Sequence, residues 1–173
     1  MIHIARIEFY CSDRDCAAND AAPFSLLASP EEYPWLLLPA GAPAEVYRSR
    51  FARGQRALIL TVDTVLAFRC WVAETSLRID ELALDWTIPK GDLCVYDVIT
   101  EQRFRGRGLY PAALSWVRNL DSQGVIGRVW VYCDASNAAS RRGIVKAGFD
   151  FASRATALVA CGTAWWRSGT VPE

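Results

Sequence analysis

A short segment rich in glycine and arginine, residues 101–108, constrains this chain more than any other feature. It reads Glu-Gln-Arg-Phe-Arg-Gly-Arg-Gly and follows a β-forming run over residues 92–100. The next segment, residues 109–120, carries its apolar side chains on one helical stripe. The first turn of such a helix exposes unpaired N–H groups and a positive dipole end, and glycines let the backbone approach a bulky anion. The segment therefore predicts a phosphate or pyrophosphate site.

Two better-known phosphate loops are excluded here. No Gly-Lys-Ser/Thr follows the glycines, so the segment is not a Walker loop. The three-glycine spacing of the dinucleotide fingerprint is also missing. The remaining alternative to an anion site is an ordinary basic loop between a strand and a helix.

The composition narrows the class of protein. The chain has 173 residues, of which 52% are hydrophobic and 22% charged, so it suits one α/β domain and not a disordered chain. Nineteen basic and nineteen acidic residues cancel, which argues against a nucleic-acid partner. No apolar run reaches the roughly 18 residues that span a bilayer, and the first residues lack a secretory signal. We expect a cytoplasmic protein without a membrane partner, as a monomer or homodimer.

The cysteines and the histidine exclude further kinds of site. The six cysteines include no Cys-x-x-Cys pair, and His3 is the sole histidine. A zinc site is therefore not expected, and a Ser-His-Asp or Cys-His nucleophile is disfavoured. Several cysteines lie within apolar runs, so we expect buried, reduced thiols.

The pattern of apolar residues and turn formers predicts an alternation of strands and helices in one domain. Strands are expected over 2–10, 56–62, 65–73, 92–100, 128–133, 149–160 and 163–167, and helices over 13–28, 44–52, 109–120 and 136–147. In the first strand, Ile2, Ile4, Ile7 and Phe9 are expected to point inward. Residues 76–88 are ambiguous. The fold class is α/β or α+β with a mixed sheet.

A second block of residues follows after one helix and one strand. It comprises Asn137-x-x-Ser140 and, in residues 146–149, Lys-x-Gly-Phe. Together with Arg-x-x-Gly-x-Gly in residues 103–108, in this order and spacing, it resembles the GNAT superfamily of acyl-CoA-dependent N-acetyltransferases. The likeness covers about residues 92–149, and the N-terminal half fits only in its order of elements.

The resemblance implies a single acyl-CoA N-acyltransferase domain over residues 1–173. It implies a mixed, mostly antiparallel central sheet of about six to seven strands flanked by helices, with two splayed parallel strands in the second half. Residues 91–168 would form the coenzyme A half and residues 1–90 the acceptor half. Acidic and aromatic residues expected at the acceptor pocket are Asp13, Asp15, Glu31, Glu32, Tyr33 and Trp35.

The resemblance also implies a role for each part of the coenzyme A half. The glycine- and arginine-rich loop would wrap the pyrophosphate with backbone N–H groups. The preceding strand end would bind the pantetheine arm and the acyl carbonyl, and Asn137 would contact the arm with Ser140 nearby. The coenzyme A-binding residues so implied are Val98, Ile99, Thr100, Arg103, Phe104, Arg105, Gly106, Arg107, Gly108, Leu109, Asn137 and Ser140.

The implied activity is transfer of an acetyl group from acetyl-CoA, without a metal, to a primary amine of a small molecule by direct attack in a ternary complex. The chain also has a looser likeness, in residues 96–100, 109–111 and 142–149, to GNATs encoded with surface-polysaccharide enzymes, and this likeness suggests an amino-sugar acceptor. A protein or peptide N-acetyltransferase and a non-catalytic acyl-CoA-binding module are the alternatives.

The catalytic residues are less well defined. Many GNATs carry a tyrosine seven positions after the asparagine, and this chain has Ile144 there. We expect Asp97 and Tyr132 to be the catalytic residues. Other candidate bases are Asp92 and Asp134, and other candidate acids are Ser140, a residue of the N-terminal half, and water.

Overall fold

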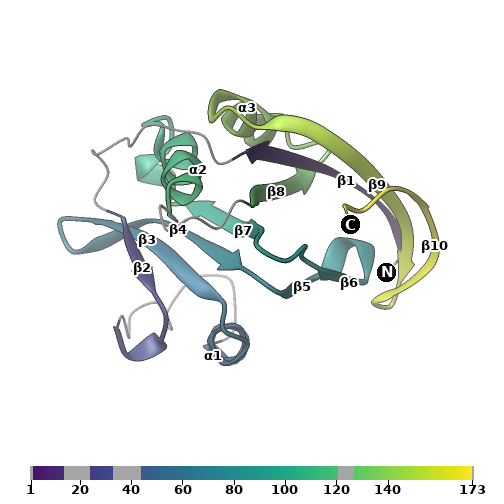
Figure 1. Ribbon diagram of the computed structural model, residues 1–173, viewed down its shortest axis with the longest axis horizontal. Coiled ribbons are helices and arrows are strands. Elements are labelled where there is room, and N and C mark those ends of the chain that lie inside the picture. The colour runs from purple at the N-terminus through teal and green to yellow at the C-terminus, as the bar shows by residue number, and fades with distance from the viewer. Residues whose placement is uncertain (1, 14–23, 33–43, 121–126, 173) are drawn as a thin grey trace.

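The structure is a computed structural model that describes residues 2–13, 24–32, 44–120 and 127–172 (Figure 1). The strands are β1 (Ile2–Asp13), β2 (Ser25–Leu27), β3 (Arg56–Val62), β4 (Val65–Ala73), β5 (Ser76–Ile79), β6 (Leu84–Thr87), β7 (Leu93–Thr100), β8 (Arg128–Asp134), β9 (Asp150–Ala160) and β10 (Thr163–Gly169). The helices are α1 (Ala44–Ala52), α2 (Leu109–Arg118) and α3 (Ala138–Lys146), with short 3-10 turns η1 (Pro30–Glu32), η3 (Asp80–Leu82) and η4 (Gln102–Phe104).

Eight strands form one sheet in the order β10-β9-β1-β8-β7-β4-β3-β2, and β5 pairs with β6 alone. Among the described strands, every neighbouring pair is antiparallel except β7 and β8. The expectation of a mixed, mostly antiparallel sheet is confirmed, although the main sheet has eight strands where six to seven were expected.

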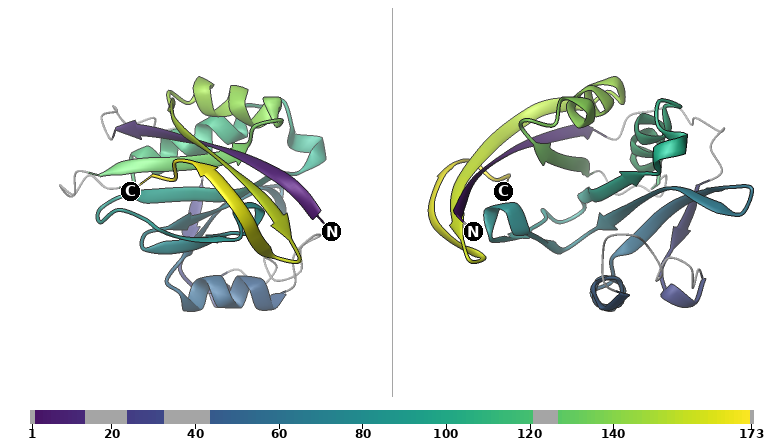
Figure 2. Two further views of the ribbon diagram at one scale, coloured as in Figure 1. Left: turned by 90° about the vertical axis from the view of Figure 1, so that its right-hand side faces the viewer. Right: turned by 180° about the vertical axis from the view of Figure 1, so that it is seen from behind.

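The two faces of the sheet carry different helices (Figures 1 and 2). Helices α2 and α3 pack on one face, over a core that includes Leu114, Val131 and Ile144. Helix α1, the β5–β6 hairpin and η3 pack on the other face, over a core that includes Tyr47 and Trp71. Because side chains alternate between faces along a strand, each strand contributes to both cores.

Strands β7 and β8 touch over a short stretch and then diverge. Their parallel pairing runs from Leu93–Val129 to Val95–Val131. Beyond it, β8 pairs with β1 and β7 pairs with β4. The first strand of the chain thus lies in the middle of the sheet, between β8 and β9, and it holds the far end of β8 away from β7. The predicted splay of two parallel strands is confirmed.

The expected orientation of the first strand is partly wrong. Ile2 and Ile4 are 73% and 60% exposed, whereas Ile7 and Phe9 are buried as expected. The odd-numbered residues of β1 face the η3 and β6 side, where the Phe9 ring lies 5.6 Å from that of Trp86. Ile2 and Ile4 belong to the even-numbered set, so they point to the opposite face.

Two other expectations need correction. Residues Ser25–Leu27 form β2, paired with β3, so the helix expected over 13–28 is wrong there; residues 14–23 lie outside the described part. The ambiguous stretch 76–88 contains β5, η3 and β6.

The described cysteines are all free thiols. Cys70, Cys94 and Cys133 are buried as expected, whereas Cys161 is exposed. Cys16 lies outside the described residues. Within the described ranges, no three His, Cys, Asp or Glu side chains come together in a way that would hold a metal ion. None of the helices that the structure describes has the length and apolar character required to cross a membrane.

Candidate active site

The glycine- and arginine-rich loop leaves several backbone donors free. Gly106 and Gly108 both have φ of +76°, a conformation that L side chains rarely adopt, and Gly108 precedes α2 directly. Within the described part of the chain, no hydrogen bond engages the N–H groups of Gly106, Arg107 or Gly108. A Cβ atom at either glycine would meet nothing within 4 Å. The loop therefore presents free donors toward open space at a helix N-terminus, as a pyrophosphate site requires.

The arginines of this loop are held by local contacts. The guanidinium groups of Arg103 and Arg107 lie 4.8 and 5.2 Å from the ring centre of Phe104, which is buried. The Nε of Arg105 donates to the carbonyl of Thr100 at 3.0 Å. Three positive charges thus surround the free donors, and the residues present fit a diphosphate group. Leu109 begins α2 beside them.

A bulge in β7 lies opposite β4. The register changes between Arg69–Ile99 and Trp71–Tyr96, which places Asp97 and Val98 opposite one residue of β4. Asp97 has a φ of +47°, and its carboxylate accepts a hydrogen bond from Arg50 of α1. A bulge turns side chains away from their regular direction. This one directs Asp97 to the opening between β7 and β8.

The opening between the two strands is a cavity of about 380 Å³. Five of the predicted site residues line it: Asp97, Val98, Tyr132, Asn137 and Ser140. Ile99 and Thr100 continue β7 beyond it toward the glycine-rich loop and pair there with β4. A second cavity of about 340 Å³ adjoins the first and extends it toward α1.

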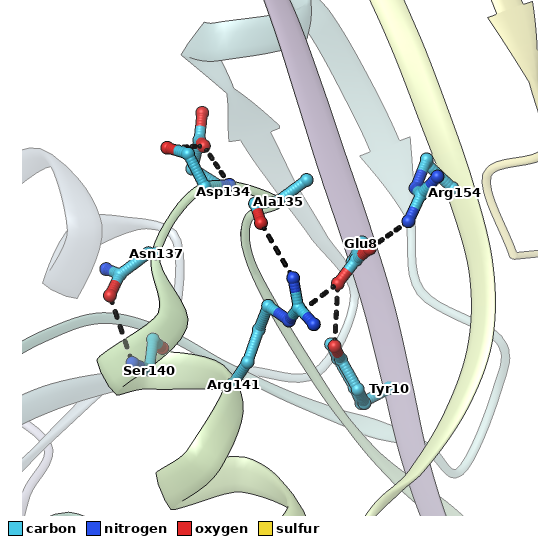
Figure 3. Close-up of polar contacts among 9 residues, drawn as sticks. Glu8, Tyr10, Asp134, Ala135, Asn137, Ser140, Arg141 and Arg154 are labelled. Atoms are coloured by element: carbon cyan, nitrogen blue, oxygen red, sulfur yellow. Dashed lines mark hydrogen bonds and ion pairs between the residues drawn. The ribbon is translucent and has the colours of Figure 1, made fainter.

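Asn137 ends the turn after β8 and caps α3. Its Oδ1 accepts the backbone N–H of Ser140 at 3.0 Å (Figure 3). The amide nitrogen of Asn137 has no partner among the described residues, and the side chain lines the cavity. Capping therefore uses one end of the amide and leaves the other for a ligand.

Tyr110 also lines the cavity, although its place in the predicted amphipathic helix indicated only a packing role. Its hydroxyl lies 3.3 Å from Oγ of Ser140, and burial raises its pKa. The ring packs against α3 at Gly143, where a Cβ would lie 2.7 Å from Cδ1 of Tyr110. A glycine inside a predicted helix was the available signal for this close approach. Ile144, by contrast, is fully buried in the core, so the usual tyrosine position of the family points away from the cavity.

A buried carboxylate holds the turn between β8 and α3 (Figure 3). Glu8 is 3% exposed and accepts hydrogen bonds from Tyr10, at 2.7 Å, and from Arg154. Arg141 approaches the same carboxylate at 3.4 Å and donates to the carbonyl of Ala135 at 3.0 Å. Burial alone would raise the pKa of Glu8, but these hydrogen bonds and charges outweigh it and lower the pKa.

The sequence alone did not single out Glu8, because a charged residue in an alternating strand is usually on the surface.

The remaining candidate acids and bases differ in position. Asp92 accepts from the N–H of Arg128 and Nε1 of Trp130, both at 2.7 Å, where β7 and β8 begin. It therefore has a structural role at the end of the strands remote from the cavity. Asp134 lines the cavity and accepts from the N–H of Ser136 at 2.7 Å. Burial raises the pKa of Tyr132, so its hydroxyl stays protonated at neutral pH.

Of the first-half residues expected at the acceptor pocket, the three that the structure describes, Asp13, Glu31 and Glu32, do not line either cavity. Asp13 lies near Arg128, at the opposite end of β8 from the cavity. Glu32 accepts the backbone N–H groups of Ala28 and Ser29. Glu31 belongs to the same short turn, η1, and Asp15, Tyr33 and Trp35 lie outside the described residues. The first-half residues that do line the two cavities come mainly from α1, β5 and η3.

Comparison with known proteins agrees with this arrangement. No family model and no curated protein matches the sequence. Solved structures do match. A putative GNAT-family acetyltransferase from Novosphingobium aromaticivorans is 19% identical over 89% of this chain and 63% of its own, with a TM-score of 0.60. A GNAT-family acetyltransferase from Colwellia psychrerythraea is 13% identical over 91% of this chain and 56% of its own, with a TM-score of 0.64.

A tandem GNAT protein from the clavulanic acid biosynthesis pathway is 19% identical over 98% of this chain and 55% of its own, with a TM-score of 0.54. The chain thus spans between half and two thirds of the length of these structures. At these identities the likeness establishes the fold. The chain has the GNAT fold, which confirms the fold expected from its two sequence blocks.

Proposed function

We propose that this protein is an acyl-CoA-dependent N-acetyltransferase that moves an acetyl group from acetyl-CoA to a primary amine of a small molecule. One observation carries the proposal. The free N–H groups of Gly106, Arg107 and Gly108 lie at the start of α2, just beyond the strand that diverges from β8. A diphosphate bound there would leave the thioester end of acetyl-CoA to reach the cavity between the strands.

The two faces of the sheet suggest how the substrates approach each other. Val98, Tyr110 and Ser140 lie on the α2–α3 side, which is the side of the glycine-rich loop. Tyr96 and Tyr132 lie on the α1 side. We assign the α2–α3 side to acetyl-CoA and the α1 side to the amine, so that they meet in the cavity between β7 and β8.

The reaction requires a neutral amine nitrogen. This nitrogen forms a bond to the acetyl carbon while the carbon–sulfur bond breaks, and the amine proton leaves the nitrogen. An alkylammonium with a pKa near about 10 must first lose a proton, so a base or a water chain assists. Asp97 faces the cavity and forms an ion pair with Arg50. Asp97 as the base stays a prediction.

The departing thiolate requires a proton or a hydrogen bond. The hydroxyl pair of Tyr110 and Ser140 lies on the side assigned to acetyl-CoA and lines the cavity. Because burial raises the pKa of Tyr110, this hydroxyl is protonated at neutral pH and can donate. We therefore assign the proton donor to Tyr110 together with Ser140. Tyr132, on the amine side, stays the alternative.

Direct transfer is favoured over an acyl-enzyme at a cysteine. Burial raises the pKa of Cys133 to about 11 and that of Cys94 also well above its ordinary value. The thiolate is the nucleophilic form, and at neutral pH both groups are thiols. This supports attack by the amine in a ternary complex.

The size of the site supports a small acceptor. The adjoining cavities, about 380 and 340 Å³, lie in the range of small-molecule pockets. The amino-sugar acceptor indicated by the sequence likeness, the cytoplasmic location and the oligomeric state stay predictions.

Two measurements test the function. Calorimetry with coenzyme A should detect binding, and free-thiol release from acetyl-CoA should depend on an added small amine. Binding without amine-dependent release from any amine, peptides included, would instead support a non-catalytic acyl-CoA-binding module. Absence of binding to folded protein would end the proposal.

A further inference from the structure

The charges that line the two adjoining cavities change sign from one to the other. Around the cavity between β7 and β8, the described carboxylates outnumber the guanidinium groups; they are Asp80, Glu81, Asp97 and Asp134 against Arg50 and Arg78. Around the cavity beside α1, the described guanidinium groups outnumber the carboxylates; they are Arg50, Arg53 and Arg78 against Glu45 and Asp80. The acceptor side is thus negative at the reaction centre and positive toward α1.

Arg50 stands at the boundary between the two cavities. Its guanidinium lies 5.1 Å from the ring centre of Trp71 and 5.0 Å from that of Tyr96, and it pairs with Asp97. A guanidinium has five N–H donors, so this pair leaves donors for a ligand. Arg53 lies in the turn directly after α1 and lines the cavity beside that helix. It donates to Ser49 at 2.8 Å and has no ion pair among the described residues.

A second, independent observation concerns a buried positive charge near α1. Arg69 is 3% exposed, and its guanidinium lies 5.0 Å from the ring centre of Tyr47, the ring that Arg50 also approaches, at 5.6 Å. Nη1 of Arg69 has no hydrogen-bond partner among the described residues. The hydroxyl of Tyr47 and Nε1 of Trp71 are likewise buried without partners in the described part. These groups line neither cavity, so they make no direct contact with a ligand there; the buried Arg69 guanidinium acts on the cavity beside α1 through its positive charge, which favours an anion.

We infer that the acceptor is a small amine that also carries an anionic group, a carboxylate or a phosphate, within about one side-chain length of its nitrogen. The amine would lie by Asp97 and Glu81, between the diverging strands, and the anionic group by Arg53 and Arg50. This inference rests on the proposed function. A neutral amine, including an unmodified amino sugar, would leave Arg53, which has no ion pair among the described residues, without a counter-charge, whereas Arg50 and Arg78 already pair with carboxylates.

Matched pairs of acceptors test the inference. One pair is an α-amino acid and its carboxamide, and the other is a hexosamine and its phosphate ester. Both catalytic efficiency and binding by calorimetry are measured with each compound. Within at least one pair, we expect the anionic member to exceed the neutral one by about 10- to 100-fold, the effect of one or two hydrogen bonds to a charged group. The pair that discriminates identifies the anion as carboxylate or phosphate.

Two variants locate the preference. Arg53→Gln should reduce the ratio of catalytic efficiencies between the anionic and the neutral member of the discriminating pair by about tenfold or more. Arg48→Gln removes the same charge from an exposed position of α1 outside both cavities, and it should leave the ratio unchanged. Equal use of both members of every pair, or a preference for the neutral ones, would overturn the inference while leaving acetyl transfer intact. Binding of the anionic member that depends on Arg53, without any thiol release, would support the inference and refute acetyl transfer. No binding and no turnover would refute both.

Discussion

Arg141 of α3 lies 3.4 Å from the carboxylate of Glu8, a residue in the middle strand of the sheet, and donates at the same time to the carbonyl of Ala135. The contact connects β1 to the turn that presents Asn137 and Ser140 to the cavity (Figure 3). A residue more than a hundred positions earlier in the chain therefore helps to position the expected coenzyme A-binding side chains.

Replacement of Glu8 by glutamine should affect both stability and substrate binding. We expect Glu8→Gln to lower the free energy of unfolding by about 1–3 kcal/mol, because a buried charged hydrogen-bond acceptor is lost. The KM for acetyl-CoA should rise more than kcat falls, because the turn that holds Asn137 loosens. Glu74→Gln is the matched control, since it removes a carboxylate from the more exposed pair with Arg56, worth about 1 kcal/mol or less. Equal KM values in the two variants would contradict the positioning role.

The same carboxylate predicts a dependence of stability on pH. The folded state lowers the pKa of Glu8, so its contribution is complete above the unfolded value of about 4.3 and is lost as the pH falls through the lower folded value. The difference in unfolding free energy between the wild type and Glu8→Gln should therefore be constant between about pH 7 and about pH 5 and shrink below about pH 4. Denaturant titrations across this range measure it. If the difference in unfolding free energy between the two proteins grew on acidification, it would contradict a lowered pKa of Glu8 in the folded state.

The loop before α2 can be tested at its second glycine. Gly108→Ala and Gly162→Ala each place a side chain at a positive φ with no atom near the new Cβ, so each should cost about 1–2 kcal/mol of stability. Gly162 lies in the turn between β9 and β10, remote from the loop. Only Gly108→Ala should raise the KM for acetyl-CoA, by about tenfold, because the strained loop no longer holds its N–H groups in place. A similar increase in Gly162→Ala would assign the effect to stability.

Tyr110→Phe tests the proton donor. The ring still packs against Gly143, so the free energy of unfolding should change by less than about 1 kcal/mol. The kcat should fall by about 10²-fold, at the low end for general acid catalysis because a thiolate leaves readily. Tyr132→Phe is the comparison on the other face of the sheet. A larger loss of kcat in Tyr132→Phe than in Tyr110→Phe would identify Tyr132, and not Tyr110, as the proton donor.

Local features of the sequence were sufficient for much of this fold. The hairpin of β3 and β4 was predicted with correct bounds, because its turn at Asp63 and Thr64 separates two β-rich runs and both turn residues adopt a positive φ. The bounds of α1 and the position of the loop before α2 were also predicted correctly. Residues 103–108 occupy consecutive positions, so their site is encoded locally.

Other features depend on contacts between distant segments. Tyr110 and Ser140 meet only because α2 and α3 approach each other at Gly143, and one helical stripe does not specify its partner. The orientation of Ile2 and Ile4 depends on which strands flank β1, and alternation alone fits either face. The lining of the second cavity was not predicted for the same reason, since α1 and β5 converge on it from separate parts of the chain.

The central place of β1 also has a consequence for how the molecule folds. Its partners include β9, with Ile2 opposite Ala160, so this pairing joins segments that lie far apart in the sequence (Figure 2). Pairings of such high contact order form slowly, and during synthesis this one cannot form until β9 has left the ribosome. Until then the edge of β1 that pairs with β9 offers its backbone groups to other chains. The arrangement that opens the cavity thus leaves the nascent protein dependent on β9 for protection of this edge against aggregation.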